Sequence, residues 1–99
     1  MLFMTTYSYE PGDRDAVIKQ RATKGALVPP GAKIIGEWSV VSGGLVFRLI
    51  EAESAQALLA AAHPWASLGT IETYPVMPVD EVMENLAPGK KQRRRAKTG

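Results

Sequence analysis

The stretch that most constrains the fold is residues 33–51, where two apolar, β-prone runs flank Ser42-Gly43-Gly44. This pattern predicts a β-hairpin, because glycine readily adopts the backbone angles of a tight turn. Counting outward from a two-residue turn at Ser42-Gly43 gives the following pairs: Val41 with Gly44, Ser39 with Val46, Trp38 with Phe47, and Glu37 with Arg48.

The alternation of side chains along a strand divides this hairpin between two faces. One face is expected to carry Ile34, Trp38, Leu45, Phe47 and Leu49. The other is expected to carry Ile35, Val46 and Ile50 around the Glu37–Arg48 pair. Neither face is polar enough to lie in water, so both need a covering layer.

The rest of the chain supplies two more strands and three helices. The predicted elements are a strand over 2–9, a helix over 14–24 with Asp13 as N-cap, a helix over 54–63 with Ser54 as N-cap, a strand over 70–77 and a short helix over 78–86. Pro75 cannot donate to a ladder, so the last strand is expected at a sheet edge. The order β-α-β-β-α-β plus a terminal helix predicts an α+β, ferredoxin-like fold with a four-stranded antiparallel sheet.

Two helices can cover only one face of such a sheet. We expect the face with Ile35, Val46 and Ile50 to be left open, which predicts a homodimer in the form of a dimeric α/β barrel. The chain has 99 residues and no cysteine, so no disulfide supports this small core. It has one histidine, so no clustered imidazole metal site is predicted.

Charge divides the chain into a domain over residues 1–87 and a basic tail over 88–99. The domain has six Lys and Arg against ten Asp and Glu, so its formal net charge is −4. The tail has six basic residues and no acidic ones, so its formal net charge is +6. The tail lacks apolar anchors and is predicted to be disordered. Two interpretations stay open: weak, salt-sensitive binding of nucleic acid or an anionic surface, or a solvated tail. The sequence shows neither signal peptide nor membrane span, so a cytoplasmic location is expected.

Four segments resemble a small bacterial family known only as a domain of unknown function and grouped with the dimeric α/β barrels. They are Lys33 to Trp38, Gly43 to Arg48, His63 to Trp65 and Ile71 to Met77, and the likeness covers roughly residues 1–86. The wider superfamily includes cofactor-free monooxygenases, haem degraders, muconolactone-isomerase-type enzymes and ligand-binding modules. Haem degraders use an Asn, a Trp and a His, but the only asparagine here is Asn85, so no catalytic residue is carried over and no cofactor is predicted.

His63 and Glu37 are the candidate catalytic residues. His63 is the one side chain whose ordinary pKa lies near neutrality, so it could serve as a general base or an axial haem ligand. The alternative is a helix C-terminal residue that stabilises the last carbonyls. Glu37 with Arg48 forms either an acid/base or anion-orienting site, or a structural ion pair that sets hairpin register or dimer geometry. Glu72 could join this pair.

Aromatic side chains suggest a ligand pocket between the second helix and the sheet. The candidates are Tyr7, Trp38, Phe47, Trp65 and Tyr74, with Arg48 as a polar group at the pocket. An ordinary aromatic core is the alternative. Three functions therefore stay open: a dimeric module that binds a small aromatic or hydrophobic molecule, a cofactor-independent monooxygenase or isomerase, and an interaction module whose tail docks on acidic partners.

Overall fold

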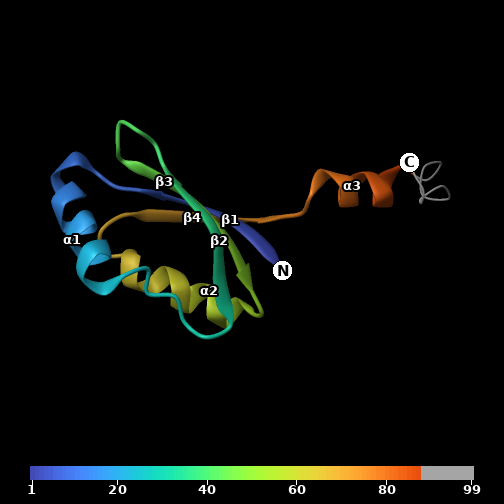
Figure 1. Ribbon diagram of the computed structural model, residues 1–99, viewed down its shortest axis with the longest axis horizontal. Coiled ribbons are helices and arrows are strands. Elements are labelled where there is room, and N and C mark those ends of the chain that lie inside the picture. The colour runs from blue at the N-terminus through green and yellow to red at the C-terminus, as the bar shows by residue number, and fades with distance from the viewer. Residues whose placement is uncertain (88–99) are drawn as a thin grey trace.

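The computed structural model describes residues 1–87, in which four strands and three α-helices alternate with two short 3-10 turns (Figure 1). The predicted tail, residues 88–99, lies outside the described residues. The elements are β1 (Leu2–Ser8), η1 (Pro11–Asp13), α1 (Arg14–Lys24), β2 (Ala32–Ser39), β3 (Leu45–Ala52), α2 (Ala55–Ala62), η2 (His63–Trp65), β4 (Thr70–Val76) and α3 (Val79–Leu86). The predicted order of elements is confirmed.

The four strands form one antiparallel sheet in the order β2-β3-β1-β4. The central strands β3 and β1 are neighbours in the sheet although more than thirty residues separate them in the chain, which is the arrangement of a ferredoxin-like fold. The strand with Pro75, β4, lies at an edge as predicted, where a missing N–H costs the sheet least.

The β2–β3 hairpin has the predicted register but a longer turn. Glu37 pairs with Arg48 as expected. The last ladder pair is Ser39 with Val46, two pairs before the predicted Val41–Gly44. The Gly43 N–H donates to the Val40 carbonyl at 2.8 Å and closes a turn over residues 40–43. Gly43 and Gly44 both have φ of 87°, which lets the chain return to β3 without strain.

The assignment of the hairpin faces to the layers was wrong, and two features explain why. First, the helices cover the face that carries Ile50, which is 1% exposed, rather than the face that carries Trp38. Second, a bulge between Ile34 and Gly36 places Ile34 opposite Ile50, on the covered face, and leaves Ile35 half-exposed. Counting residues along one strand could not detect the extra residue that a bulge inserts.

Helices α1 and α2 lie on the same side of the sheet (Figure 1). The buried core between these layers is small and consists of Val17, Ile50, Ala52, Ala61 and Trp65. Helix α2 begins as predicted, since the Ser54 side chain accepts a hydrogen bond from the Ala57 N–H at 3.1 Å. Its alanine-rich sequence allows the helix to approach the sheet closely.

The other face of the sheet has no covering helix within the described residues, and α3 stands away from the sheet (Figure 1). We call this the open face; two rows of directly opposed residues cross it. They are Trp38, Phe47, Thr6 and Glu72, followed by Gly36, Leu49, Met4 and Tyr74. Trp38 and Tyr74 are 56% and 50% exposed. The excess apolar surface predicted from the sequence therefore exists, but it is formed by the opposite set of residues.

Candidate functional site

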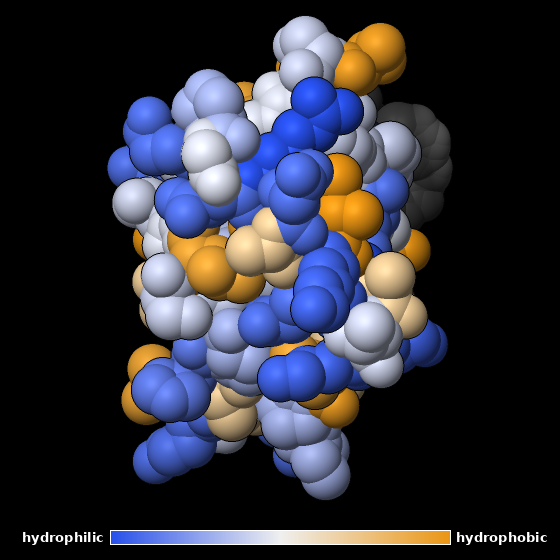
Figure 2. All heavy atoms as spheres, turned by 90° about the vertical axis from the view of Figure 1, so that its left-hand side faces the viewer, coloured by the Kyte–Doolittle hydropathy of each residue, from blue (hydrophilic) through white to orange (hydrophobic). Residues whose placement is uncertain are grey.

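A cavity of about 100 Å³ lies between the covered face of the sheet and the two helices. Its lining is Thr5 and Tyr7 of β1, Val17 and Arg21 of α1, Glu37 of β2, Val46, Arg48 and Ile50 of β3, Leu58, Ala61 and Ala62 of α2, Trp65, and Ile71 and Thr73 of β4. Engineered apolar cavities of roughly 150 Å³ bind benzene, so this space is on the scale of a single ring. Apolar residues also show between hydrophilic ones on the surface at the α1 end of the molecule (Figure 2).

A polar row crosses the floor of the cavity. Strand register places Arg48 directly opposite Glu37 on one side and Thr5 on the other, and Thr5 in turn opposite Thr73. The next row on one side contains Val46, Tyr7 and Ile71, and the row on the other side contains Ile34, Ile50 and Phe3. The sheet therefore carries one charged line across an otherwise mainly apolar covered face.

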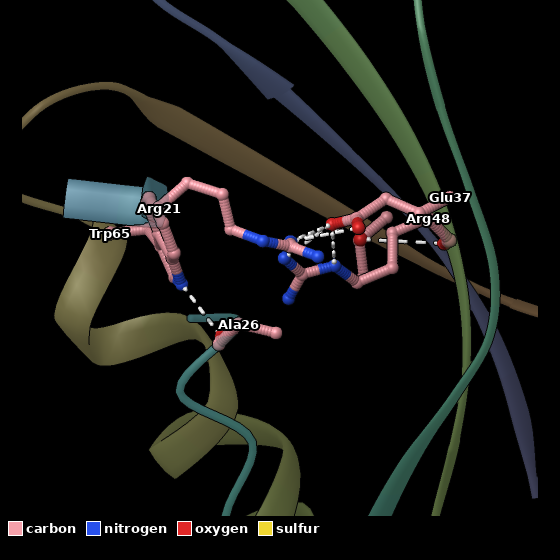
Figure 3. A network of polar contacts seen from close by, with 6 residues as sticks. Arg21, Ala26, Glu37, Arg48 and Trp65 are labelled. Carbon is pink, nitrogen blue, oxygen red and sulfur yellow. Dashed lines mark hydrogen bonds and ion pairs between the residues drawn. The ribbon is translucent and has the colours of Figure 1, made fainter. Parts of the chain in front are cut away.

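Two arginines converge on the Glu37 carboxylate (Figure 3). Arg48 donates from Nε and Nη2 to Oε2 at 3.1 and 2.8 Å, in the same strand ladder. Arg21 extends from α1 and donates from Nη1 to Oε2 at 2.9 Å. The same Nη1 lies 2.8 Å from Oε1. The side chain of Arg48 is 15% exposed and that of Arg21 is 46% exposed, so one arginine belongs to the sheet and the other to the rim.

This arrangement holds Glu37 in its charged form. Burial alone would raise its pKa, but hydrogen bonds and positive charge from Arg48 and then Arg21 outweigh burial and lower the pKa below its ordinary value. A carboxylate with a lowered pKa and two guanidinium partners is a weak proton acceptor at neutral pH. Glu37, Arg48 and Arg21, which we call the triad, are therefore better suited to orient an anionic or polar group than to abstract a proton.

Trp65 and Tyr7 form the aromatic wall of the cavity. The Trp65 indole is 5% exposed, and its Nε1–H donates to the Ala26 carbonyl at 3.2 Å (Figure 3). The Tyr7 hydroxyl donates to the Trp65 carbonyl at 2.9 Å, and the two rings meet edge to face at 5.9 Å. Burial, with the nearby charge of Asp13, raises the Tyr7 pKa, so the phenol stays protonated.

The structure brings together four of the eight residues proposed from the sequence. Tyr7, Trp65, Glu37 and Arg48 all line the cavity. The four others do not line it: Trp38, Phe47 and Tyr74 lie on the open face, and His63 is exposed in η2. Strand alternation separates Trp38 from Glu37, because adjacent residues of a strand point to opposite faces.

Glu72 does not join the triad, contrary to the sequence-based suggestion. It pairs with Thr6, on the open face, and its carboxylate accepts a hydrogen bond from the Tyr74 hydroxyl at 3.0 Å. That hydrogen bond, with the negative charge, raises the Tyr74 pKa.

Sequence reasoning missed Arg21, Thr5 and Thr73 as parts of this site. Arg21 follows the buried Val17 by four residues, so it lies one turn along the same helix face, and that spacing is a usable signal. Thr5 and Thr73 had no such signal, because their place beside Arg48 depends on how β1 pairs with β3 and β4.

Within residues 1–87 no group of three or more His, Cys, Asp and Glu side chains is arranged to hold a metal ion. In the same residues, no helix has the length and apolar character needed to cross a membrane.

Comparisons with known proteins give one family match and two similar solved structures, of which the first described below supports the fold. A family model described as a domain of unknown function (DUF3303) matches residues 1–90. A solved structure of an uncharacterized NIPSNAP domain protein from Burkholderia xenovorans is similar over 79% of this chain and 94% of that chain, with 20% identity and a TM-score of 0.51. A protein described as an antibiotic biosynthesis monooxygenase from Deinococcus radiodurans is similar over 78% and 92%, with 13% identity and a TM-score of 0.47. No curated protein matches the chain.

Proposed function

The chain belongs to the DUF3303 family, and on that premise we propose that it is a binding protein for a small aromatic or hydrophobic molecule held between the sheet and α2. The supporting observation is the cavity itself: a mainly apolar space of about 100 Å³ with one polar row on its floor. Ligand sites typically combine apolar walls with a few convergent polar groups that orient the ligand.

The alanines of α2 support this proposal. Ala61 and Ala62 line the cavity beside Leu58, and larger side chains at these positions would fill it. If only stability were selected, larger side chains would fill this space, because a void removes van der Waals contacts from the residues that line it. The small side chains of Ala61 and Ala62 therefore leave space for a ligand beside the charged row.

The test uses single-ring probes and one filled variant. Toluene, phenol, benzamide and benzoate are titrated into the full chain, and backbone amide shifts are followed by NMR. At least one probe is expected to bind saturably and to shift the amides of Ile50 and Ala61. Ala62→Met should abolish binding, whereas Ala60→Met, on the exposed side of the same helix, should not. Absence of saturable binding by every probe, or equal binding to both variants, would count against a ligand site here.

We also propose that two copies of the chain pair through the open face. Apolar and aromatic residues cross this face, and Phe47 at its centre is 37% exposed. The apolar side of α3 is equally uncovered, with Val79 73%, Met83 45% and Leu86 75% exposed. A second copy is the occupant that we favour, because a two-fold axis lets one apolar sheet cover its own duplicate.

Sedimentation equilibrium at micromolar concentration tests the pairing. The wild-type chain is expected to be a dimer and Phe47→Glu a monomer. Val41→Glu places the same charge at the exposed hairpin tip, outside the sheet, and should remain dimeric. A wild-type monomer at about 1 mM, well above ordinary dimer dissociation constants, would exclude this pairing.

A further inference from the structure

The charges at the cavity do not balance. Arg21 and Arg48 bring two positive charges to Glu37, which brings one negative charge. Among the residues that line the cavity, no other carboxylate or imidazole is present, and the Tyr7 phenol is neutral. The polar row and its rim therefore carry one net positive charge, contributed by the well-buried Arg48 and the half-exposed Arg21.

Several guanidinium donors have no protein acceptor within residues 1–87. Arg48 uses Nε and Nη2 on Glu37, and no hydrogen bond to a described residue occupies its Nη1. Arg21 uses Nη1 alone, which leaves its Nε and Nη2. A planar guanidinium with two free N–H groups matches the two oxygens of a carboxylate.

We propose that the ligand of this cavity is a small ring or short hydrocarbon that carries one anionic group of the carboxylate class, bound by Arg21 and Arg48. This inference rests on the proposed ligand site. The apolar part lies against Ile50, Leu58 and Trp65, and the anion completes the charge balance of the polar row. One bound negative charge neutralises the site, whereas a dianion would leave it net negative.

The two arginines have different tasks. Arg48 is 15% exposed, lies within the sheet and is held by two hydrogen bonds, so it forms a preorganised floor. Arg21 is 46% exposed and belongs to the helix at the rim, so its unused Nε and Nη2 are accessible to an arriving anion while Nη1 stays on Glu37. Arg21 is therefore the residue to alter, because its removal spares the hairpin.

The test compares benzoate with benzamide, which share a ring and a planar substituent but differ in charge. Isothermal titration calorimetry on the full chain is expected to give benzoate an affinity at least about tenfold higher than benzamide. Arg21→Gln should weaken benzoate by about tenfold and leave benzamide within about twofold. Lys24→Gln removes the same charge from the exposed last turn of α1 and should change neither probe by more than about twofold.

The outcomes separate this inference from the proposed function. If benzamide or toluene binds as tightly as benzoate, or if Arg21→Gln acts no differently from Lys24→Gln, the cavity is a ligand site but the anion assignment is overturned. If no probe binds at all, both proposals fail together.

Discussion

The Glu37 carboxylate lies directly across the β2–β3 ladder from Arg48 and accepts hydrogen bonds from its Nε and Nη2 at 3.1 and 2.8 Å. Cross-strand neighbours of opposite charge stabilise a hairpin and oppose register slips. This pair differs from a surface pair because helices cover its face of the sheet and Arg21 adds a third charge. A single contact thus contributes both to the fold and to the candidate site.

Glu37→Gln is expected to lower the free energy of unfolding by about 1–3 kcal/mol, because two arginines lose the carboxylate that pairs them in a partly buried setting. Urea denaturation followed by far-UV circular dichroism measures the loss. Glu10→Gln removes an exposed carboxylate and should cost less than about 0.5 kcal/mol. Equal effects of the two substitutions would show that the triad contributes nothing measurable.

The contribution of Glu37 to stability should depend on pH. Since its pKa in the folded chain is lowered, the stabilisation is fully present above the ordinary carboxyl pKa and is lost as the pH falls through the lower, folded value. The wild type should therefore exceed Glu37→Gln in unfolding free energy at pH 7 and converge with it in acid. The charged groups that face this carboxylate are Arg48 from the sheet and Arg21 from α1. A difference between the two proteins that is constant from pH 7 to pH 2 would contradict this prediction.

Trp65→Phe is expected to destabilise the fold by about 1–3 kcal/mol. It removes the indole N–H that satisfies the Ala26 carbonyl and part of the wall against Tyr7. Trp38→Phe is the matched control, since this side chain is 56% exposed and should cost less than about 0.5 kcal/mol. Chemical denaturation at low protein concentration, where no dimer forms, compares the two. A larger loss from Trp38→Phe would reverse the assignment of the two faces.

Gly69→Ala is expected to destabilise the chain and to weaken binding in the cavity. A methyl group at this position would press on the Ser8 carbonyl and on the ring of Tyr7, which lines the site. The free energy of unfolding should fall by about 1–3 kcal/mol, because the Ser8 carbonyl is part of the β1 backbone and cannot move aside. Gly12→Ala meets open space and should lie within about 0.5 kcal/mol of the wild type. Thermal unfolding and benzoate titration of both variants provide the measurement.

The local sequence pattern was sufficient to predict most of the secondary structure and the hairpin pairing. Ser54 before an alanine-rich run predicted the start of α2, and the glycines after Ser42 predicted the hairpin. The Glu37–Arg48 pairing followed from counting along that hairpin. These features depend on neighbours close in sequence, and for such neighbours backbone preference and spacing suffice.

The candidate site was predicted in part. The second helix and the sheet were expected to enclose a pocket with Tyr7 and Trp65, and the structure has a cavity there. Trp38 was grouped with the pocket because it is aromatic, but its neighbour Glu37 already occupies the covered side of the same strand. Residue type alone could not decide between faces when both are apolar.

The sequence by itself determined which segments are strands and helices, in what order, and which residues oppose each other across the hairpin, because short-range sterics, capping and turn chemistry decide these. Only the tertiary structure decided which face of the sheet the helices cover and that Arg21, Thr5 and Thr73 meet Arg48. The bulge between Ile34 and Gly36 and the pairing of strands far apart in the chain set those relationships. They arise from packing the whole chain at once, since each face offered comparable apolar surface to the helices.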